Sequence, residues 1–403
     1  MTGNRPRVRF FTTSFPREPE DAAGGFVAGL ASGLAAGGVE VSVEAAVSDW
    51  GPPGVRTRAW ARGNPLFLGA GAPDRLAAES GSPGVRSEAA RAGLQVLARG
   101  LTTRGTHDVA VGHWLVPCGP AARAAGGRVV LYAHGSDVAL LESLPGGRAL
   151  ARVLDLGAAH LNFVSADLAR RFEALLGRVP RAATTVLPMG LADPAPDPDA
   201  LAIALRGLPP VPRAVVHVVT VGRLVRLKGL DVLARALAGR PDVVWTAAGD
   251  GPERGPLEAL CRSLGVDVRL PGALPPGARD ALLRQADVFV LPSRPLGRRS
   301  EGTPLALLEA QLAGLPCVAS DVGGVRDAAA NEGVRCVPPD DPPALRAALA
   351  AWLDGPDAGN RRAEAGRSAA AFADRFRWVR LLPAHRAAIL GAVRPGGTSC
   401  AWR

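Results

Sequence analysis

The sequence predicts an α/β protein built from two doubly wound parallel sheets, one in each of two domains. Short apolar runs of strand length alternate with segments that have the apolar spacing of helices, which is the pattern of βαβ units. The alternation occurs twice along 403 residues, and a segment dense in proline separates the two series. We therefore expect two Rossmann-like domains that face a cleft, with ligands at the carboxyl ends of the strands.

The first series occupies the N-terminal half of the chain. Helices are expected at residues 25–36 and 167–176. Residues 51–90 are rich in Gly, Pro and Arg and predict a long loop. The expected strands lie at residues 8–12, 39–46, 107–112, 129–133, 161–165 and 185–188.

The second series follows the proline-rich segment. Its expected strands lie at residues 215–221, 243–248, 288–292, 317–320 and 334–337. Its expected helices lie at residues 230–238, 256–264, 279–285, 304–313, 344–353 and 361–376. We therefore expect an N-terminal domain at 1–195, a Pro-rich linker at 196–212 and a C-terminal domain at 213–380. Residues 381–403 form an expected helix or tail that can return to the N-terminal domain.

Composition and charge exclude several classes of protein. Apolar residues make up 47% and charged residues 21%, which is typical of globular proteins rather than of disordered chains. No apolar run is long enough for a transmembrane helix, the start has no secretory signal, and five widely spaced cysteines fit the cytoplasm. The net charge is +10, but basic residues form no block and aromatic residues make up only 4%, so we expect no nucleic-acid partner.

The strongest motif is Glu301-Gly-Thr-Pro-Leu-Ala-Leu-Leu-Glu309, which follows the expected strand at 288–292. Thr303 is a good N-cap and Pro304 a good first helical residue, so a helix should begin here with its free N–H groups at the strand ends. Such a helix start can bind an anion, and Glu309 would then reach hydroxyl groups farther along the ligand. A plain capped helix with an exposed glutamate is the alternative.

The second motif, Gly222-Arg-Leu-Val-Arg-Leu-Lys-Gly229, follows the strand at 215–221. Arg223 offers a planar fork for phosphate oxygens and Lys228 a compact charge. Lys228 is the one lysine among the 47 basic residues of the chain. Two solvated loop cations are the alternative reading, and the retention of this single lysine argues against it.

Three weaker features belong to the N-terminal half. Gly24 and Gly25 precede a helix and permit close approach of a ligand to the backbone. The segments His113-Trp114 and His134-Gly-Ser-Asp137 each end an expected strand. A flexible turn and structural histidines are the alternatives. Asp197-Pro-Asp199 resembles a metal motif but lies in the linker, and no ligand spacing elsewhere supports a metal site.

Together these motifs resemble a retaining glycosyltransferase of the GT-B fold, family 4, also called glycosyl transferases group 1. The resemblance covers residues 8 to 380. Its most specific segments are 301–327, with two glutamates eight positions apart and a later glycine pair, and VGRLVRLKG at 221–229. GDGP at 249–252 and VLPMG at 186–190 also match. The histidine segments of the N-terminal half resemble the subset that builds cell-wall and capsular polysaccharides, including teichuronic-acid enzymes.

The resemblance implies a role for each matching position in the C-terminal, donor-binding domain. Arg223 and Lys228 would hold the diphosphate of a nucleotide-sugar, and Glu309 the ribose hydroxyls. Glu301 would contact the sugar as a catalytic residue. The turn formed by Gly302, Thr303, Pro304 and Leu305 would bind the donor through backbone N–H groups, although many relatives have asparagine where Leu305 stands.

The N-terminal, acceptor-side domain would supply the remaining groups. Gly25 would approach the phosphates or the acceptor, and His134 would lie beside the anomeric carbon as a catalytic residue. His113, Trp114 and Asp137 are the acceptor-side candidates. The resemblance implies no cofactor and no metal, because cations and helix ends replace it.

The expected activity is transfer of a hexosyl unit from a nucleotide-diphosphate sugar, with a UDP-sugar favoured, to a hydroxyl group of a glycan, a lipid-linked glycan or a small molecule. A nucleotide-sugar 2-epimerase of the same fold and a non-catalytic binding relative are the alternatives. We expect a cytoplasmic protein, with the segment Arg86–Arg104 open to a second role as an amphipathic helix on the inner face of an anionic membrane.

Overall fold

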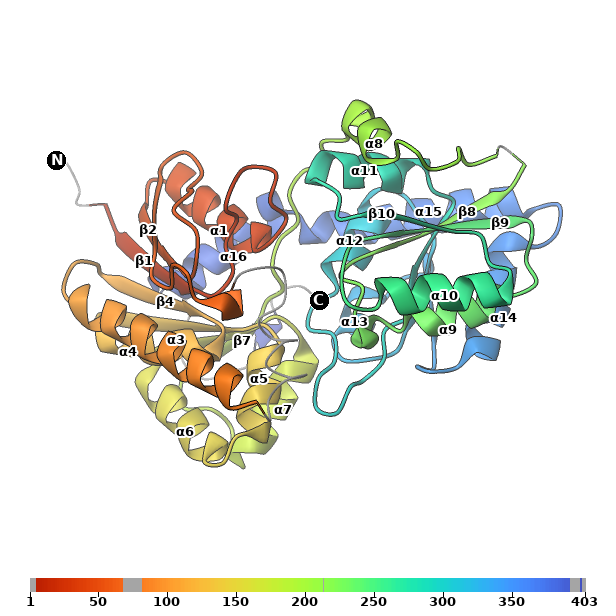
Figure 1. Cartoon of the computed structure of the whole chain (residues 1–403). Helices are drawn as coiled ribbons and strands as arrows, with labels where there is room; N and C mark the ends of the chain where they lie inside the picture. The colour runs from red at the N-terminus through yellow and green to blue at the C-terminus, as the bar shows by residue number, and fades with distance from the viewer. Residues whose placement is uncertain (1–4, 68–81, 213, 392–398, 401–403) are drawn as a thin grey trace. The chain divides into compact units, whose positions relative to one another are not determined.

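The computed structural model describes residues 5–67, 82–212, 214–391 and 399–400 (Figure 1). The chain forms two compact units, the first made of residues 1–192 and 378–403 and the second of residues 193–377. Each unit contains one parallel sheet with helices on both faces. The expected fold class, two doubly wound α/β bodies, is confirmed.

The first unit is built on an eight-stranded sheet in the order β14-β7-β6-β5-β4-β1-β2-β3, with every neighbouring pair parallel. The inner strands read as continuous apolar runs because parallel sheets are covered on both faces. Its strands are β1 (Arg7–Thr12), β2 (Glu40–Ala45), β3 (Val55–Ala59), β4 (Val109–His113), β5 (Arg128–Ala133), β6 (His160–Phe163), β7 (Ala183–Val186) and β14 (Ser399–Cys400). Its helices are α1 (Gly25–Ala36), η1 (Pro65–Phe67), α3 (Pro83–Thr102), α4 (Leu115–Ala125), α5 (Ser136–Ser143), α6 (Gly147–Gly157), α7 (Ala166–Leu176) and α16 (Trp378–Leu390).

The strand order of this sheet reverses direction at β1, whose neighbours are β2 and β4. At such a switch point the loops leaving adjacent strands diverge and open a crevice at their carboxyl ends. The loop between β1 and α1, the turn after β4 and the turn after β5 therefore start beside one another. These are the segments that carry Gly25, His113, Trp114 and His134.

The last helix of the chain, α16, packs in the first unit against α1, β4 and β6. Its first residue, Trp378, lies so close to two glycines that a Cβ at Gly29 would be 2.2 Å from the indole nitrogen, and one at Gly190 would be 2.4 Å from the ring. Arg128 of β5 donates to the carbonyl of Ile389, which is fully buried. The helix thus completes the core of a unit that begins at the other end of the chain.

The second unit has a six-stranded parallel sheet in the order β10-β9-β8-β11-β12-β13, which reverses direction at β8. Its strands are β8 (Val216–Val221), β9 (Val243–Ala248), β10 (Val268–Gly272), β11 (Val288–Leu291), β12 (Cys317–Ser320) and β13 (Val334–Val337). Its helices are α8 (Pro198–Ala204), η2 (Arg226–Lys228), α9 (Leu230–Leu237), α10 (Arg254–Leu264), α11 (Pro276–Gln285), α12 (Leu305–Leu312), α13 (Val325–Ala328), α14 (Pro342–Leu353), α15 (Ala358–Ala373) and η3 (Asp374–Phe376).

Several segments differ from the sequence-based expectation, which gave no element where β10, α4, α5 and α6 lie. The long loop expected at 51–90 contains β3, η1 and the start of α3 in its described part, while residues 68–81 lie outside the described residues. The expected linker at 196–212 contains α8, which packs on α11. Asp197 caps α8 by accepting from the N–H of Ala200 at 2.9 Å, which gives this aspartate a structural role. Both loops had been predicted from their Gly and Pro content, and proline is also common at the start of a helix.

Candidate active site

Four turns of the second unit follow adjacent strands, in the order β9, β8, β11 and β12. The turn after β8 carries Arg223 and Lys228, and the turn after β11 carries Glu301. The turn after β9 contains GDGP, and the turn after β12 contains the glycine pair Gly323-Gly324. All four sequence motifs of this half therefore start from one edge of one sheet.

Glycines let the β8 and β9 turns lie backbone to backbone. Gly249 has φ +146°, and a Cβ there would lie 1.8 Å from the carbonyl oxygen of Gly222. The N–H of Gly222 donates to Ala248 at 3.0 Å, and that of Leu224 donates to Asp250 at 2.9 Å. The GDGP motif thus supports the turn that carries Arg223.

The β8 turn is also fixed against the end of β11. Gly229 has φ +59°, and a Cβ there would lie 2.0 Å from the carbonyl oxygen of Pro292. The N–H of Arg294 donates to Leu227 at 2.9 Å. The side chain of Arg294 pairs with Asp231 at 2.6 Å and Asp340 at 2.7 Å, so this arginine anchors the loop.

Lys228 and Glu301, 73 positions apart in the sequence, form an ion pair of 2.8 Å between Nζ and Oε1. Ser293 donates its hydroxyl to the same oxygen at 2.5 Å. Burial raises the pKa of Glu301, but Lys228, Ser293 and Arg223 together outweigh burial and hold the pKa below its ordinary value. Glu301 is therefore a carboxylate at neutral pH.

The backbone of Glu301 is held from the β12 turn. Gly323 has φ +53°, and a Cβ there would lie 2.2 Å from the carbonyl oxygen of Glu301. The N–H of Gly324 donates to this oxygen at 3.0 Å. The glycine pair of the motif thus allows the β12 turn to hold Glu301 in place.

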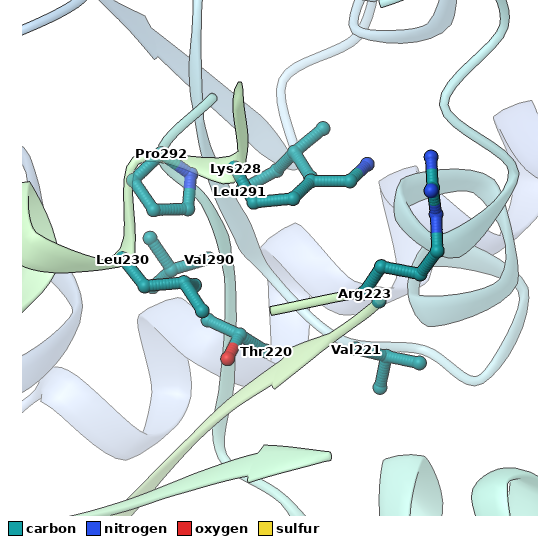
Figure 2. Close-up of a pocket in the computed structure, with 9 residues that line it drawn as sticks. Thr220, Val221, Arg223, Lys228, Leu230, Val290, Leu291 and Pro292 are labelled. Carbon is teal, nitrogen blue, oxygen red and sulfur yellow. The ribbon is translucent and has the colours of Figure 1, made fainter. Parts of the chain in front are cut away.

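A small pocket lies at the ends of β8 and β11. Arg223 and Lys228 are among the residues that line it (Figure 2). Burial and the positive charge of Arg299 lower the pKa of Arg223, and burial lowers the pKa of Arg299. Lys228 pairs with Glu301, and Arg223 lies near enough to lower its pKa. Arg299 lies near Arg223, so three cations and one carboxylate leave an excess of positive charge for an anionic ligand.

The helix after Glu301 begins one residue later than expected. The first residue of α12 is Leu305, and Pro304, expected as the first helical residue, is its N-cap with φ −79° and ψ 82°. Thr303, expected to cap the helix, lies before it, and its carbonyl accepts from the N–H of Leu305 at 3.0 Å. The prediction of the cap was wrong, because the non-helical ψ of Pro304 places the start of α12 one position farther along. Gly302 lies beside Glu301 in the same turn.

Glu309 lies on α12 and pairs with Arg279 of α11 at 3.1 Å. Burial raises its pKa to about 7, since the attraction of Arg279 is partly offset by the repulsion of Asp280. Its protonation state can therefore change near neutral pH. The alternative to a ligand-binding role was an exposed glutamate on a plain capped helix. In the structure, Glu309 is instead ion-paired with Arg279.

In the first unit, the ends of β4 and β5 bring His113 and His134 together, with 3.1 Å between Nδ1 of His113 and Nε2 of His134. Trp114 and Phe26 pack on the ring of His134 with centroid distances of 4.5 and 5.3 Å. Trp114 has φ 67°, a strained value for a residue with a Cβ. Burial lowers the pKa of His134 to about 3 and that of His113 well below its ordinary value. Both histidines are therefore neutral at physiological pH.

Asp137 is buried beneath this cluster, and its carboxylate organises the surrounding turns. It accepts from the N–H groups of Leu115, His134, Gly135 and Val138 at 2.8–3.1 Å. Burial raises its pKa, and these four amides oppose that rise. The side chain proposed as an acceptor contact therefore holds the β4 and β5 turns. At Gly25, by contrast, an added Cβ would meet no atom within 4 Å, so its backbone has open space beside it.

Comparison with known proteins decides the family. Residues 214–369 match glycosyl transferases group 1. The chain is 34% identical over 306 residues, 72% of this chain and 78% of the relative, to the GDP-mannose-dependent alpha-(1-6)-phosphatidylinositol monomannoside mannosyltransferase of Mycolicibacterium smegmatis. This chain belongs to the glycosyl transferases group 1. It is an enzyme of a retaining hexosyltransferase family that uses nucleotide-sugar donors.

Two further similarities fit this family. The chain is 35% identical to the D-inositol 3-phosphate glycosyltransferase of Segniliparus rotundus over 49% of this chain and 44% of the relative. It superimposes on the sucrose-phosphate synthase of Thermosynechococcus elongatus with a TM-score of 0.73, at 18% identity and over 95% of this chain and 98% of that one, which shows the GT-B fold. The expected affinity of this glycosyltransferase with teichuronic-acid enzymes is not supported, because the relatives above are named for inositol-bearing acceptors.

Two residues of the site were missed from the sequence. Neither Arg299 nor Ser293 was singled out. Ser293 follows a strand of the same sheet edge as Lys228, and this position was the available signal. Its partner Glu301 became visible only once the turns were placed together.

Proposed function

We propose that this glycosyltransferase moves a hexosyl unit from a nucleotide-diphosphate sugar to a hydroxyl acceptor with retention of configuration. The observation that carries this proposal is the cation cluster of Arg223, Lys228 and Arg299, in which Lys228 pairs with the ionised Glu301. Cations fixed in place before the reaction stabilise the charge that develops on a leaving diphosphate.

Each group at the site receives a role in this proposal. Arg223 and Lys228 bind the diphosphate, and the backbone of 302–305 borders it. Glu301 accepts a hydrogen bond from a sugar hydroxyl, and Glu309 accepts from the ribose. In the first unit, the backbone of Gly25 approaches the phosphates or the acceptor, and the neutral His134 lies beside the sugar. His113 and Trp114 fix the ring of His134.

The reaction breaks the bond between the anomeric carbon and the phosphate oxygen, and the electron pair leaves with the diphosphate. The acceptor oxygen forms the new bond to the anomeric carbon on the same face. Its proton passes to the departing phosphate, so no protein nucleophile is needed. The cluster around Lys228 lowers the barrier by stabilising the leaving group.

We place GDP-mannose ahead of the UDP-sugar that the sequence favoured. The relative that matches 72% of this chain is named for GDP-mannose, whereas the UDP-sugar rested on the family resemblance alone. Donors with different bases make different contacts with the protein, so binding measurements can identify the base that this enzyme recognises.

The first test is thermal stabilisation by GDP, UDP and ADP without added metal. Binding at 100 Kd contributes about 2.7 kcal/mol, which shifts the melting temperature measurably. We expect GDP to give the largest shift and Arg223→Ala to abolish it. The proposed donor site would be contradicted if none of the three diphosphates stabilised the wild type and no nucleotide-sugar supported transfer.

We further propose a lipid-linked acceptor and peripheral binding to the cytoplasmic face of an anionic membrane. No helix among the described residues is long and apolar enough to cross a bilayer. The outer faces of α3 and α6 expose Leu94, Leu101, Val153 and Leu156. Arginines are interspersed on these faces, as on helices that lie on anionic lipid.

Co-sedimentation with vesicles tests this surface. Vesicles that contain phosphatidylinositol should bind the chain at low salt, and vesicles of phosphatidylcholine alone should not. Leu94→Gln combined with Leu156→Gln should abolish the binding, while the GDP-induced thermal shift should persist. Equal recovery of the double variant and the wild type would refute the surface.

A further inference from the structure

One buried side chain beside the cation cluster has no role in the proposal above. Ser293 is 0% exposed and follows β11 directly after Pro292. Its hydroxyl donates to Oε1 of Glu301 at 2.5 Å. A buried hydroxyl bonded to a carboxylate is a charge-assisted contact, which is stronger and more directional than a neutral one.

The position of Ser293 is fixed on both sides by the backbone. Before it, Pro292 packs on the backbone of Gly229. After it, the N–H of Arg294 donates to Leu227, and the side chain of Arg294 is held by two aspartates. The hydroxyl therefore starts from a rigid support, as groups that orient a reacting side chain require.

Ser293 and Lys228 bind the same oxygen of Glu301. Both recorded hydrogen bonds fall on Oε1, and Oε2 has none among the residues that the structure describes. The backbone of Glu301 is held by Gly324 at the same time. Glu301 is thus held at three points, two on Oε1 and one on its backbone carbonyl, and Oε2 is left over.

The two partners of Oε1 differ in what they can do when a donor binds. The ammonium of Lys228 carries three donors on a flexible stem, so it can turn toward a phosphate. The hydroxyl of Ser293 has one donor on a short side chain and stays with Oε1. The orientation of Glu301 during catalysis then depends on Ser293.

We propose, resting on the proposed function, that Ser293 is a positioning residue of the transferase: its hydroxyl holds Oε1 of Glu301 so that Oε2 accepts a hydrogen bond from a hydroxyl group of the donor sugar. Ser293 itself does not touch the donor. It acts through Glu301 on the sugar, and it does not act on the diphosphate.

The test compares Ser293→Ala with Ser320→Ala. Ser320 is also a buried serine at the carboxyl end of a neighbouring strand, so its variant measures the general cost of removing such a hydroxyl. We expect Ser293→Ala to lower kcat with the nucleotide-sugar by about tenfold to 100-fold, the usual effect of losing a partner that orients a reacting group. The GDP-induced thermal shift should stay as in the wild type, and Ser293→Thr, which keeps the hydroxyl, should restore most of kcat.

The pH profile separates positioning from a purely structural role. The groups that face Glu301 are Lys228 and Arg223 from the β8 turn and Ser293 from the β11 turn. The Ser293 hydrogen bond is one of the contacts that lower the pKa of Glu301, so its removal should move the acid limb of kcat to higher pH. Ser320→Ala should leave this limb unchanged. If Ser293→Ala does not fold, Ser293→Cys nearly keeps the volume, weakens the hydrogen bond and should shift the limb in the same direction.

The outcomes distinguish the two proposals. An active wild type in which Ser293→Ala matches Ser320→Ala in kcat and in the acid limb overturns the positioning role and leaves the proposed function intact. A wild type that transfers from no nucleotide-sugar overturns the proposed function and the positioning role with it. Loss of the GDP-induced shift in a folded Ser293→Ala would assign the serine to diphosphate binding and overturn the inference.

Discussion

The strand ends of the two units carry opposite kinds of chemistry. In the second unit, Lys228, Arg223 and Glu301 are charged, paired and placed by turns that need glycine. In the first unit, His113 and His134 are neutral and packed among aromatic rings. A diphosphate needs fixed charge, whereas a sugar or an acceptor hydroxyl needs shape and neutral hydrogen-bond groups. Under the proposed function, the same sheet topology would serve two different recognition tasks.

The largest expected effect concerns the charged strand ends of the second unit. Lys228→Ala should lower kcat/KM by about 10²–10³-fold, because single preorganised charge-stabilising groups contribute this much in other enzymes. Steady-state kinetics with the donor measures the effect.

The control for this variant is Arg226→Ala, which removes an exposed cation from the same turn. It should change kcat/KM by no more than about twofold, because exposed charges contribute little. Equal losses in both variants would mean that the net charge of the turn matters, and the specific role of Lys228 would be refuted.

The next prediction tests whether the buried carboxylate of Asp137 stabilises the fold of the first unit. Asp137→Ala leaves four buried N–H groups without their acceptor. We expect the free energy of unfolding to fall by on the order of 3 kcal/mol, measured by urea denaturation. Asp199→Ala, an exposed aspartate on α8, should change it by less than about 0.5 kcal/mol. A fully stable Asp137→Ala that loses activity would instead place this carboxylate in the chemistry.

The smallest expected effect is the pH dependence of donor binding, which we attribute to Glu309 in the second unit. Because burial raises the pKa of Glu309 to about 7, its carboxylate is mostly protonated at pH 6 and mostly ionised at pH 8. A nucleotide-sugar has no phosphate group that titrates in this range. We expect it to bind about five- to tenfold more tightly at pH 8 than at pH 6 by calorimetry, and Glu309→Gln should remove this difference.

The same shift has the opposite sign for the stability of the free chain. Folding raises the pKa of Glu309 above its ordinary 4.5, so the stability that this group contributes is present below 4.5 and is lost as the pH rises through about 7. A pH dependence of binding that survives in Glu309→Gln would place the titrating group elsewhere.

Sequence reasoning identified the two parallel sheets because strand and helix periods are local signals. It also singled out Lys228 and Glu301, since motifs after strands must lie at one edge of a parallel sheet. It did not find that they pair, because contact between turns depends on strand order, which periodicity does not give. Ser293 was missed for the same reason, since a lone serine after a strand is informative only when its partner is known.

Asp137 illustrates another limit of sequence reasoning. The side chain stands in a motif beside His134, and the sequence gives no sign that its oxygens point to backbone amides. Thr303 and Pro304 show a third limit, because both are good residues for a helix start and the backbone placed the start one residue later. Propensity identifies such an end to within a residue or two, and tertiary contacts decide the rest.

The return of α16 to the first unit has a consequence for synthesis on the ribosome. The face of α1 that packs against α16 stays uncovered until residue 390 has left the exit tunnel. The whole second unit is translated first, which takes roughly ten to forty seconds at about 5–20 residues per second. During that interval the nascent first unit exposes an apolar surface. Until α16 leaves the tunnel, this surface is exposed to chaperones and to other nascent chains.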